Sequence, residues 1–496
     1  MGMSKVWSKE EKDGPSSHIN EKGIGWIIAA IFIIGETAGG GMIALSYALT
    51  SMGLIPGLVL LLLCAAFSCY TALELSWTWK IMQNRWPDYR DHCRKPYGEM
   101  AYRTIGRKMR SFIAFMICIT QIGFATVLVL LAAKNLSILL HFFFSVDINQ
   151  CYLILIVGVA VWPATMLKSP MHFWQAALFS AGSSTLAVLL VVIGMAHDAP
   201  VCSQDVPHEE PNVFKAFMAF GTFVFAYGGH ATLPTIQHDM RKPAHFVHSV
   251  VLAICFCTLL YLAIAVGGYF VYGNTVGEAI IPSLQVVWIQ QTVNLMIAVH
   301  VITTIVIVMS PPIQQVEQIL KVPHRFGVKR FLVRSLLFWL VIFIALSIPH
   351  FGPFLDLIGA STMVLMTLIL PPVFYLSIRT QEVKWTEEER QNSSQQVPVD
   401  HERASLREIL RLTPKPILIL NAAVLIFGII GGTLSTITSI IRLADSELAP
   451  PCYWQYFTRG LPFSGDNIGS VNCCGVFRNL TVSGRDPLGY CSLSDF

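Results

Sequence analysis

Charged residues are scarce in this chain of 496 residues. Aspartate, glutamate, lysine and arginine together make up 13%, whereas hydrophobic residues make up 54%. Ordinary globular proteins have about a quarter of charged residues, so this shortage excludes an ordinary soluble domain. The net charge is only +4, and no part of the charge pattern resembles a nucleic-acid-binding surface.

The motifs of pumps, metalloproteins and enzymes are missing as well. The sequence has no Walker loop, which argues against an ATP-driven pump, and no cysteine and histidine spacing that suggests zinc. No nucleophile stands in a recognisable catalytic motif. We therefore predict that the chain is not an enzyme and binds no cofactor.

Long uncharged stretches are what the chain has instead. A helix needs about 20 apolar residues to cross the hydrocarbon core of a bilayer. Ten uncharged stretches, with an opening segment that only Glu36 interrupts, predict an all-α polytopic membrane protein with eleven transmembrane helices. The ten stretches are Leu54–Leu73, Ser111–Ala133, Cys151–Leu167, Ser169–Ala196, Ala216–Gln237, Phe246–Gly277, Ala279–Val316, Ser335–Leu355, Leu357–Ile378 and Pro416–Ile441.

The basic residues predict the orientation. If the N-terminus is cytoplasmic, 28 of the 34 lysine and arginine residues fall in inner segments, as the positive-inside tendency requires. Residues 1–22 then form a cytoplasmic tail without a cleaved signal peptide. Residues 23–441 form one membrane domain with a cytoplasmic linker at 379–415, and residues 442–496 form an extracellular or luminal tail.

The outer side of the predicted membrane domain is rich in cysteine. Six cysteines there could form three disulfides, whose pairing the sequence does not give, or remain free thiols. The sequon Asn479-Leu480-Thr481 predicts glycosylation of Asn479 in the same tail. The six disulfide candidates are Cys151, Cys202, Cys452, Cys473, Cys474 and Cys491.

Two of the hydrophobic segments are broken by glycines. Gly23–Leu49 contains Gly35-Glu36-Thr37-Ala38-Gly39-Gly40-Gly41, and Ala216–Gln237 contains Phe225-Ala226-Tyr227-Gly228-Gly229-His230. Inside hydrocarbon an unwound backbone persists only where it lines a cavity or is covered by protein. Paired broken helices at matching places of two repeats indicate the substrate site of a transporter.

Five pieces of sequence, in order, resemble the amino acid/auxin permease family. The first are Gly39–Ala48 with Met52–Gly57, and Leu233–Pro243 at the end of the sixth predicted helix. Gly267–Gly273, Pro311–Glu317 and Leu357–Ala360 complete the match. Ser46 departs from the family pattern, where proline is usual, and Glu36 is an added carboxyl group.

The resemblance implies a leucine-transporter-like fold, in which helices 1–5 and 6–10 are inverted repeats and helix 11 is appended. It also implies an amino acid as substrate. The zwitterion's carboxylate needs N–H donors at a helix N-terminus, which Gly39, Gly40 and Gly41 could supply. Its ammonium group needs carbonyls, which the second break could supply at Phe225, Ala226, Tyr227 and Gly228. The alternative for each glycine is close packing of helices.

Four further residues are candidates for ion coupling. Glu36 is an intramembrane carboxyl group, which is costly and usually functional, although it could also be a protonated structural acid. His230 lies in the second break and could titrate or act as a neutral hydrogen-bond partner. Thr303 and Thr304 could contribute hydroxyls to a sodium site, or satisfy local carbonyls.

Several other charged residues are expected near helix ends. These are Glu74, Asp239, Glu317 and Asp356, and Asp239 or Glu317 could pair with Arg241 or Lys242 at an inner gate.

These observations predict a secondary active transporter, with proton-coupled symport of neutral amino acids by alternating access as the first hypothesis. Sodium-coupled symport, a non-transporting amino acid sensor of the same fold, and a passive channel are the alternatives. Amino acid and lipid bilayer are the expected partners, nucleic acid is not, and the oligomeric state is left open. The plasma membrane is the expected location, with a lysosomal or synaptic vesicle membrane as the alternative.

Overall fold

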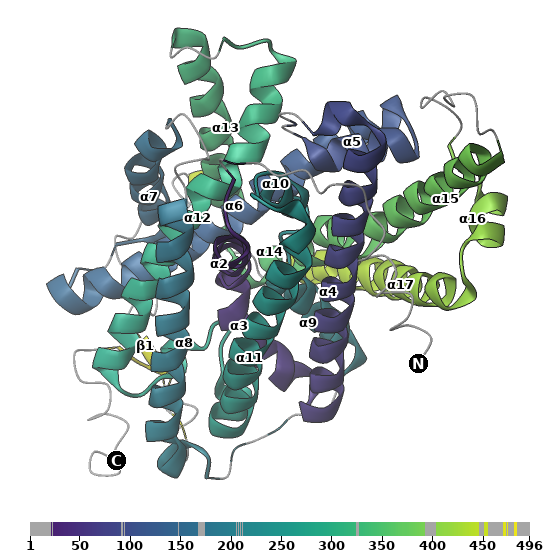
Figure 1. Cartoon of the computed structure of the whole chain (residues 1–496). Coiled ribbons are helices and arrows are strands. Elements are labelled where there is room, and N and C mark those ends of the chain that lie inside the picture. Colours follow the sequence, from purple (N-terminus) through teal and green to yellow (C-terminus); the bar gives the residue numbers. More distant parts are fainter. Residues whose placement is uncertain are drawn as a thin grey trace.

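The chain folds almost entirely into helices in the computed structural model (Figure 1). The structure describes residues 21, 23–90, 93, 95–146, 148–166, 174–204, 206, 208, 210, 212–323, 327–391, 403–445, 451–454, 470–472, 474 and 481–483. The α-helices are α2 (Trp26–Thr37), α3 (Gly40–Met52), α4 (Leu54–Arg85), α5 (Pro96–Thr104), α6 (Arg107–Phe144), α7 (Gln150–Thr165), α8 (Trp174–Cys202), α9 (Val213–Ala226), α10 (Leu233–His238), α11 (Phe246–Tyr272), α12 (Val287–Ile319), α13 (Val328–Ser347), α14 (Phe351–Ile358), α15 (Leu370–Gln391), α16 (Leu406–Leu412) and α17 (Lys415–Asp445).

Short helical turns and one small sheet complete the described structure. The strands β1 (Ser470–Asn472) and β2 (Thr481–Ser483) pair antiparallel, with Val471 opposite Val482, so the expected all-α chain has this one addition. The 3-10 turns are η1 (Pro87–Tyr89), η3 (Pro243–His245), η4 (Gly273–Thr275) and η5 (Ile281–Ser283), and the π-helical turns are η6 (Gly359–Met363) and η7 (Leu365–Ile369).

Eight helical segments among the described residues are long and apolar enough to cross a membrane. They are α4, α6, α8, α11, α12, α13, α17 and the continuous segment Phe351–Glu387, which joins α14 to α15 through η6 and η7. The pair α2 and α3, bent by 57°, counts as a ninth, and α7 and α9 are shorter apolar helices. The chain is therefore a multi-pass membrane protein.

Two expected helix boundaries lie elsewhere in the structure, and the expected linker has some helix. Glu74 is not near a helix end, because α4 continues to Arg85. The boundary expected at Asp356 lies instead between Ser347 and Phe351, and Asp356 is buried within a helix. The linker expected at 379–415 is partly helical, since α15 extends to Gln391 and α16 begins after a capping box between Ser405 and Glu408.

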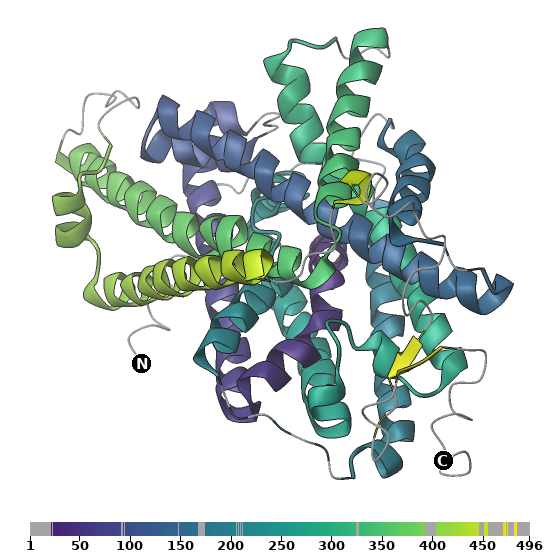
Figure 2. The ribbon, with the colours of Figure 1, turned by 180° about the vertical axis from the view of Figure 1, so that it is seen from behind.

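The two broken segments lie at the centre of the bundle. In Figure 1, α2 and α3 occupy the middle of the view, between α8 and α12 on one side and α4 on the other. Helix α11 packs against both α2 and α3, and α3 packs against α9. Seen from behind, α15, α16 and α17 lie together at one edge of the bundle (Figure 2).

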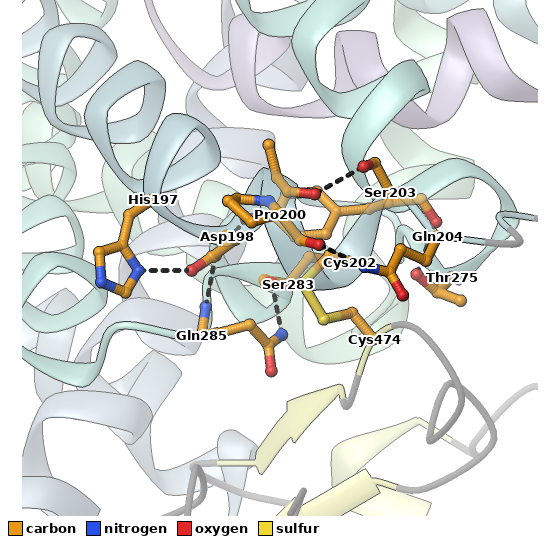
Figure 3. Close-up of a disulfide and its surroundings, with 12 residues drawn as sticks. His197, Asp198, Pro200, Cys202, Ser203, Gln204, Thr275, Ser283, Gln285 and Cys474 are labelled. Carbon is orange, nitrogen blue, oxygen red and sulfur yellow. Dashed lines mark hydrogen bonds and ion pairs between the residues drawn. A yellow bond between two sulfur atoms is a disulfide. The ribbon is translucent and has the colours of Figure 1, made fainter.

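Four of the six disulfide candidates are paired. Cys151 is bonded to Cys452, and Cys202 is bonded to Cys474 beside the small sheet (Figure 3). These bonds tie the last segment of the chain to the start of α7 and the end of α8. Cys473, Cys491 and the sequon residue Asn479 lie outside the described residues.

The end of α8 is fixed by a buried carboxylate next to the second disulfide. Asp198 accepts a hydrogen bond from the Tyr272 hydroxyl at 2.6 Å. It also accepts one from the Gln285 backbone N–H at 2.9 Å (Figure 3). Its side chain is buried, and a buried carboxylate needs donors of this kind. Asp198 therefore joins α8 and α11 to the start of α12.

Ion pairs connect helix ends on both sides of the bundle. Glu317 at the end of α12 lies 3.0 Å from Arg330 and 2.6 Å from Arg334 of α13. The pairing expected for Glu317 with Arg241 or Lys242 was therefore wrong, because α13 folds back beside α12. On the other side, Arg442 of α17 lies 3.3 Å from both Glu278 and Asp356.

Candidate functional site

The first break lies where α2 ends at Thr37 and α3 begins at Gly40. Ala38 and Gly39 both leave helical geometry, with φ/ψ of −78°/71° and −132°/−137°. The Ala38 N–H still donates to Ile34 O at 2.8 Å, and the Gly39 N–H donates to Thr37 O at 2.9 Å. The helix axis bends by 57° here.

The second break separates α9 from α10. Helix α9 ends at Ala226, and α10 begins at Leu233 with Pro234 in its first turn. Gly229 lies between them with φ of +113°, a left-handed conformation that favours glycine. The Thr232 N–H donates back to Gly229 O at 3.0 Å. Glycine and proline together thus end one half-helix and begin the next.

One hydroxyl group joins the two breaks. The Tyr261 hydroxyl of α11 lies 2.8 Å from Thr37 O and 2.8 Å from Ala226 O. Both carbonyls belong to the last residue of a half-helix, where no intrahelical N–H is available. Tyr261 is fully buried, and its ring packs edge-on against Tyr227. The two half-helices therefore end at the same donor, although the sequence places them almost 190 residues apart.

The Glu36 carboxyl group makes a second link between the breaks. Its Oε2 accepts a hydrogen bond from the Thr232 hydroxyl at 2.5 Å, and its Oε1 is buried without a hydrogen-bond partner. Gly229 lies next to it, because a Cβ at that position would be 3.6 Å from Glu36 Cδ. Sequence reasoning singled out Glu36, but only the fold shows that it faces the second break.

Each of the three expected carboxylate-binding glycines also has a close neighbour on another helix. A Cβ at Gly39 would lie 2.5 Å from His300 Nε2, one at Gly40 3.3 Å from Leu131, and one at Gly41 2.9 Å from Ala226 Cα. Close packing of helices therefore explains why these three positions hold glycine. Gly40 and Gly41 are also the first residues of α3, so their N–H groups have no acceptor within the helix.

The carbonyls expected to hold an ammonium group are partly in use. Phe225 O accepts the Gly228 N–H at 3.0 Å, and Ala226 O accepts the Tyr261 hydroxyl. The Tyr227 side chain is engaged with α11, because its hydroxyl donates to the Thr258 hydroxyl at 3.0 Å. In this conformation, then, two of the four residues use their carbonyls for contacts within the protein.

His230 contacts α4 rather than Glu36. Its Nε2 lies 2.9 Å from Ser68 O and 3.1 Å from the Thr71 hydroxyl, and its Nδ1 is buried without a partner. A carbonyl can only accept, so Nε2 carries the hydrogen. His230 is 2% exposed and therefore ties the second break to α4.

The two threonines of α12 have different surroundings. The Thr303 hydroxyl bonds only to carbonyls of its own helix, Val299 O and His300 O. Thr304 is buried, and its hydroxyl lies 2.9 Å from the Ser180 hydroxyl of α8. Only Thr304 is therefore near the first break.

His300 is the residue at this place that sequence reasoning missed. Its Nδ1 lies 2.7 Å from the Ser184 hydroxyl and 2.8 Å from the Ser180 hydroxyl, which also donates to Gly35 O at 2.7 Å. Its ring reaches Gly39, as the Cβ contact shows. The available signal was a histidine inside an uncharged stretch, three residues before Thr303. His300 thus lies between α8, α12 and the first break.

Replacing Gly39 by alanine is expected to destabilise the protein by about 1–3 kcal/mol, because the new methyl group overlaps the His300 ring. Thermal unfolding in detergent measures this. Gly182→Ala is the matched control, since a Cβ there meets nothing within 4 Å. In a His300→Ala background the Gly39→Ala penalty is expected to shrink; an unchanged penalty would show that the two side chains do not compete for space.

Comparison with known proteins decides the family. The family model described as "Transmembrane amino acid transporter protein" matches residues 22–397. The chain belongs to this family. Its relatives are named as transporters rather than enzymes, in agreement with the prediction that it is not an enzyme. The family resemblance read from the sequence is thereby confirmed.

Two relatives from Arabidopsis thaliana illustrate the similarity within the family. "Amino acid transporter AVT1B" is 26% identical over 70% of this chain and 64% of its own length. "Lysine histidine transporter-like 6" is 24% identical over 75% of this chain and 85% of its own length. The chain spans just under two thirds of the length of AVT1B and of its relative AVT1C.

A solved structure has a fold similar to that of this chain. The inward-facing conformation of Mhp1 aligns with 92% of this chain and 97% of its own chain, with a TM-score of 0.51 and 12% identity. At that identity the likeness concerns the fold alone. It agrees with the predicted leucine-transporter-like fold.

Proposed function

We propose that this chain is a secondary active transporter that moves neutral amino acids together with protons by alternating access. The observation that carries the proposal is the position of Tyr261, whose hydroxyl lies 2.8 Å from the carbonyl that ends each of the two half-helices. Broken helices that meet at one point are the arrangement in which transporters of this kind bind substrate. Family membership supports an amino acid as that substrate.

The proposed substrate site uses both breaks. The substrate carboxylate binds the N–H groups at the start of α3, with Gly39, Gly40 and Gly41 allowing close approach. The ammonium group binds carbonyls of Phe225, Ala226, Tyr227 and Gly228. The carbonyls of Phe225 and Ala226 each accept a hydrogen bond within the protein, and in this proposal binding exchanges those hydrogen bonds for bonds to the substrate. That exchange links substrate binding to movement of the half-helices.

Proton coupling is assigned to Glu36 and His230. Glu36 Oε1 and His230 Nδ1 are both buried without a partner, and either atom can take a proton. The expected sodium site at Thr303 and Thr304 has less support, because Thr303 bonds only to its own helix and the His300 ring lies beside Thr304.

The proposed topology has eleven spans, arranged as two inverted repeats of five with α17 appended. The bent α2–α3 pair, the eight long segments and the shorter helices α7 and α9 supply them. The N-terminus is placed in the cytoplasm and the C-terminal tail outside the plasma membrane or in a vesicle or lysosome lumen. In intact cells, Cys151→Ser should free Cys452 for a membrane-impermeant maleimide; protection of Cys452 until the cells are permeabilised would contradict plasma membrane delivery or this orientation.

Uptake into cells that lack related transporters tests the function. Radiolabelled amino acids are offered with and without an inward proton gradient and with and without sodium. A gradient of about two pH units supplies enough free energy for about 100-fold accumulation with one proton per substrate. We expect neutral amino acids to accumulate against their gradient when the outside is acidic, without sodium.

Each other outcome rejects a stated part of the proposal. Accumulation that requires sodium rejects proton coupling and returns the ion site to Thr304. Uptake that only equilibrates, with no accumulation, rejects active transport. Binding of an amino acid to the purified protein without uptake, when the protein is at the membrane tested, supports a sensor of the same fold.

A further inference from the structure

Helix α4 contains a buried carboxyl group that the proposed substrate and coupling sites do not use. Glu74 is fully buried, and neither of its carboxyl oxygens has a hydrogen bond of ordinary geometry. It lies about 9 Å deeper along the helix than Lys80, six residues away at 1.5 Å rise per residue. A group in this position is costly unless it is neutral or paired.

Two polar side chains converge on Glu74. The Tyr70 hydroxyl, one turn earlier on α4, and the Asn421 amide of α17 both interact with its carboxyl group. Asn421 is fully buried, its Nδ2 donates to the Tyr70 hydroxyl oxygen at 2.8 Å, and its Oδ1 has no partner. Because the Tyr70 oxygen accepts from Asn421, the Tyr70 hydrogen is free to point at the carboxyl group.

We propose that Glu74, Tyr70 and Asn421 form a second intramembrane proton-binding site, between α4 and the appended helix α17. When Glu74 is charged, its carboxylate accepts the Tyr70 hydrogen. When it is protonated, its own hydrogen can be donated to Asn421 Oδ1, the acceptor that otherwise has no partner. The same three side chains can therefore hold either state with one hydrogen bond.

A proton fits this site better than a metal ion. One carboxyl group, one hydroxyl group and one amide oxygen give few oxygen ligands, and hard cations such as calcium take six to eight. No group of three His, Cys, Asp or Glu side chains within the described residues could hold a metal. A proton needs only one base and removes the charge that the membrane interior disfavours.

The charged and titratable groups around the site suggest which end of α4 the proton reaches. Tyr375 of α15 interacts with Tyr70, and Arg379, one turn further, donates to the Tyr375 hydroxyl at 2.9 Å. This row of hydroxyl groups leads toward the end of the bundle that carries α16. The other titratable and charged groups on or around α4 lie in two directions along that helix. Toward Arg85 they are His238, Tyr89, Tyr97 and Arg103. Toward Leu54 they are His230, which lies beside Thr71, and Tyr227, Tyr261, Cys64, Cys69, Cys255 and Cys257.

Infrared spectroscopy of the purified full-length protein tests the assignment without any transport. A protonated carboxyl group has its own C=O stretching band, separate from that of a carboxylate. We expect one such band that disappears in Glu74→Gln, moves in Glu74→Asp, and persists in Glu36→Gln. Its intensity is expected to fall reversibly as the pH rises from about 5 to about 9, the range over which buried carboxyl groups release protons.

Glu408→Gln is the matched control. Glu408 is solvent-accessible at the N-terminus of α16, where its hydrogen bonds to Lys384 and to the Ser405 backbone lower its pKa to about 2. It is therefore ionised throughout the titration and must not alter the band. A wild-type spectrum without a Glu74 band, or a Glu74 band that ignores pH, would overturn the proposal. Either result leaves the proposed amino acid transport untouched, because no substrate is present.

Discussion

Glutamine in place of Glu36 is expected to abolish accumulation driven by a proton gradient while leaving exchange of amino acid across the membrane measurable. Glutamine has nearly the same shape and can still accept the Thr232 hydrogen bond that Glu36 Oε2 accepts at 2.5 Å. It cannot take up or release a proton. The change therefore separates the proton from the rest of the site.

The expected size of the effect follows from the gradient. One pH unit is worth about 1.4 kcal/mol per proton, which is a tenfold concentration ratio. With about two pH units across the membrane, the accumulation ratio should fall from as much as about 100 to about 1. Uptake of labelled substrate against a known internal volume measures this ratio.

The control for this experiment is Glu408→Gln, because Glu408 carries its charge outside the membrane-spanning helices and pairs with Lys384 at 2.7 Å. It should accumulate substrate like the unmodified chain. If Glu36→Gln still accumulates substrate when the outside is acidic, Glu36 is a structural acid. His300→Gln and His230→Gln would then be the variants that locate the coupling group.

Removing the Tyr261 hydroxyl is expected to have the next largest effect. Phenylalanine keeps the ring, which packs on Tyr227 at 5.1 Å between centroids. It leaves Ala226 O without its donor, whereas Thr37 O keeps the Gly39 N–H at 2.9 Å. A buried polar group left without its partner costs about 1–3 kcal/mol, and we expect thermal stability to fall by that amount.

Transport by Tyr261→Phe should fall by more than stability alone explains. If the hydroxyl holds both half-helices in the binding geometry, a loss of about 1.4–2.8 kcal/mol in that geometry slows uptake by about 10–100-fold. Tyr97→Phe is the matched control, since Tyr97 is also buried and donates to one carbonyl, Met366 O, at 2.8 Å. Equal uptake by the two variants, per folded molecule, would show that Tyr261 only stabilises the bundle.

Local sequence was enough to predict a multi-pass helical membrane protein and the two breaks. A run of apolar residues gains free energy in hydrocarbon residue by residue, so its position can be predicted without knowing its neighbours. Glycine and proline likewise act on their own backbone: Gly229 has a left-handed φ of +113°, and Pro234 lies in the first turn of α10. The family resemblance rests on the same local stretches.

Boundaries were less certain where a charge lies inside a helix. The sequence suggested that Glu74 and Asp356 mark helix ends, whereas both are buried within helices. Groups from distant parts of the chain surround both: Thr222 and Arg442 bond to Asp356, and Asn421 of α17 interacts with Glu74. Those partners reduce the cost of burial that hydropathy assigns to a lone charge.

The sequence by itself determined which residues are apolar, where the backbone must break and which cysteines could pair. Only the tertiary structure decided that Cys151 pairs with Cys452, that Tyr261 bridges the two breaks, and that His300 rather than Thr303 faces Gly39. The physical reason is that transfer into the membrane depends on each residue alone. Contacts between helices depend on how their surfaces fit, and those surfaces come from segments far apart in the chain.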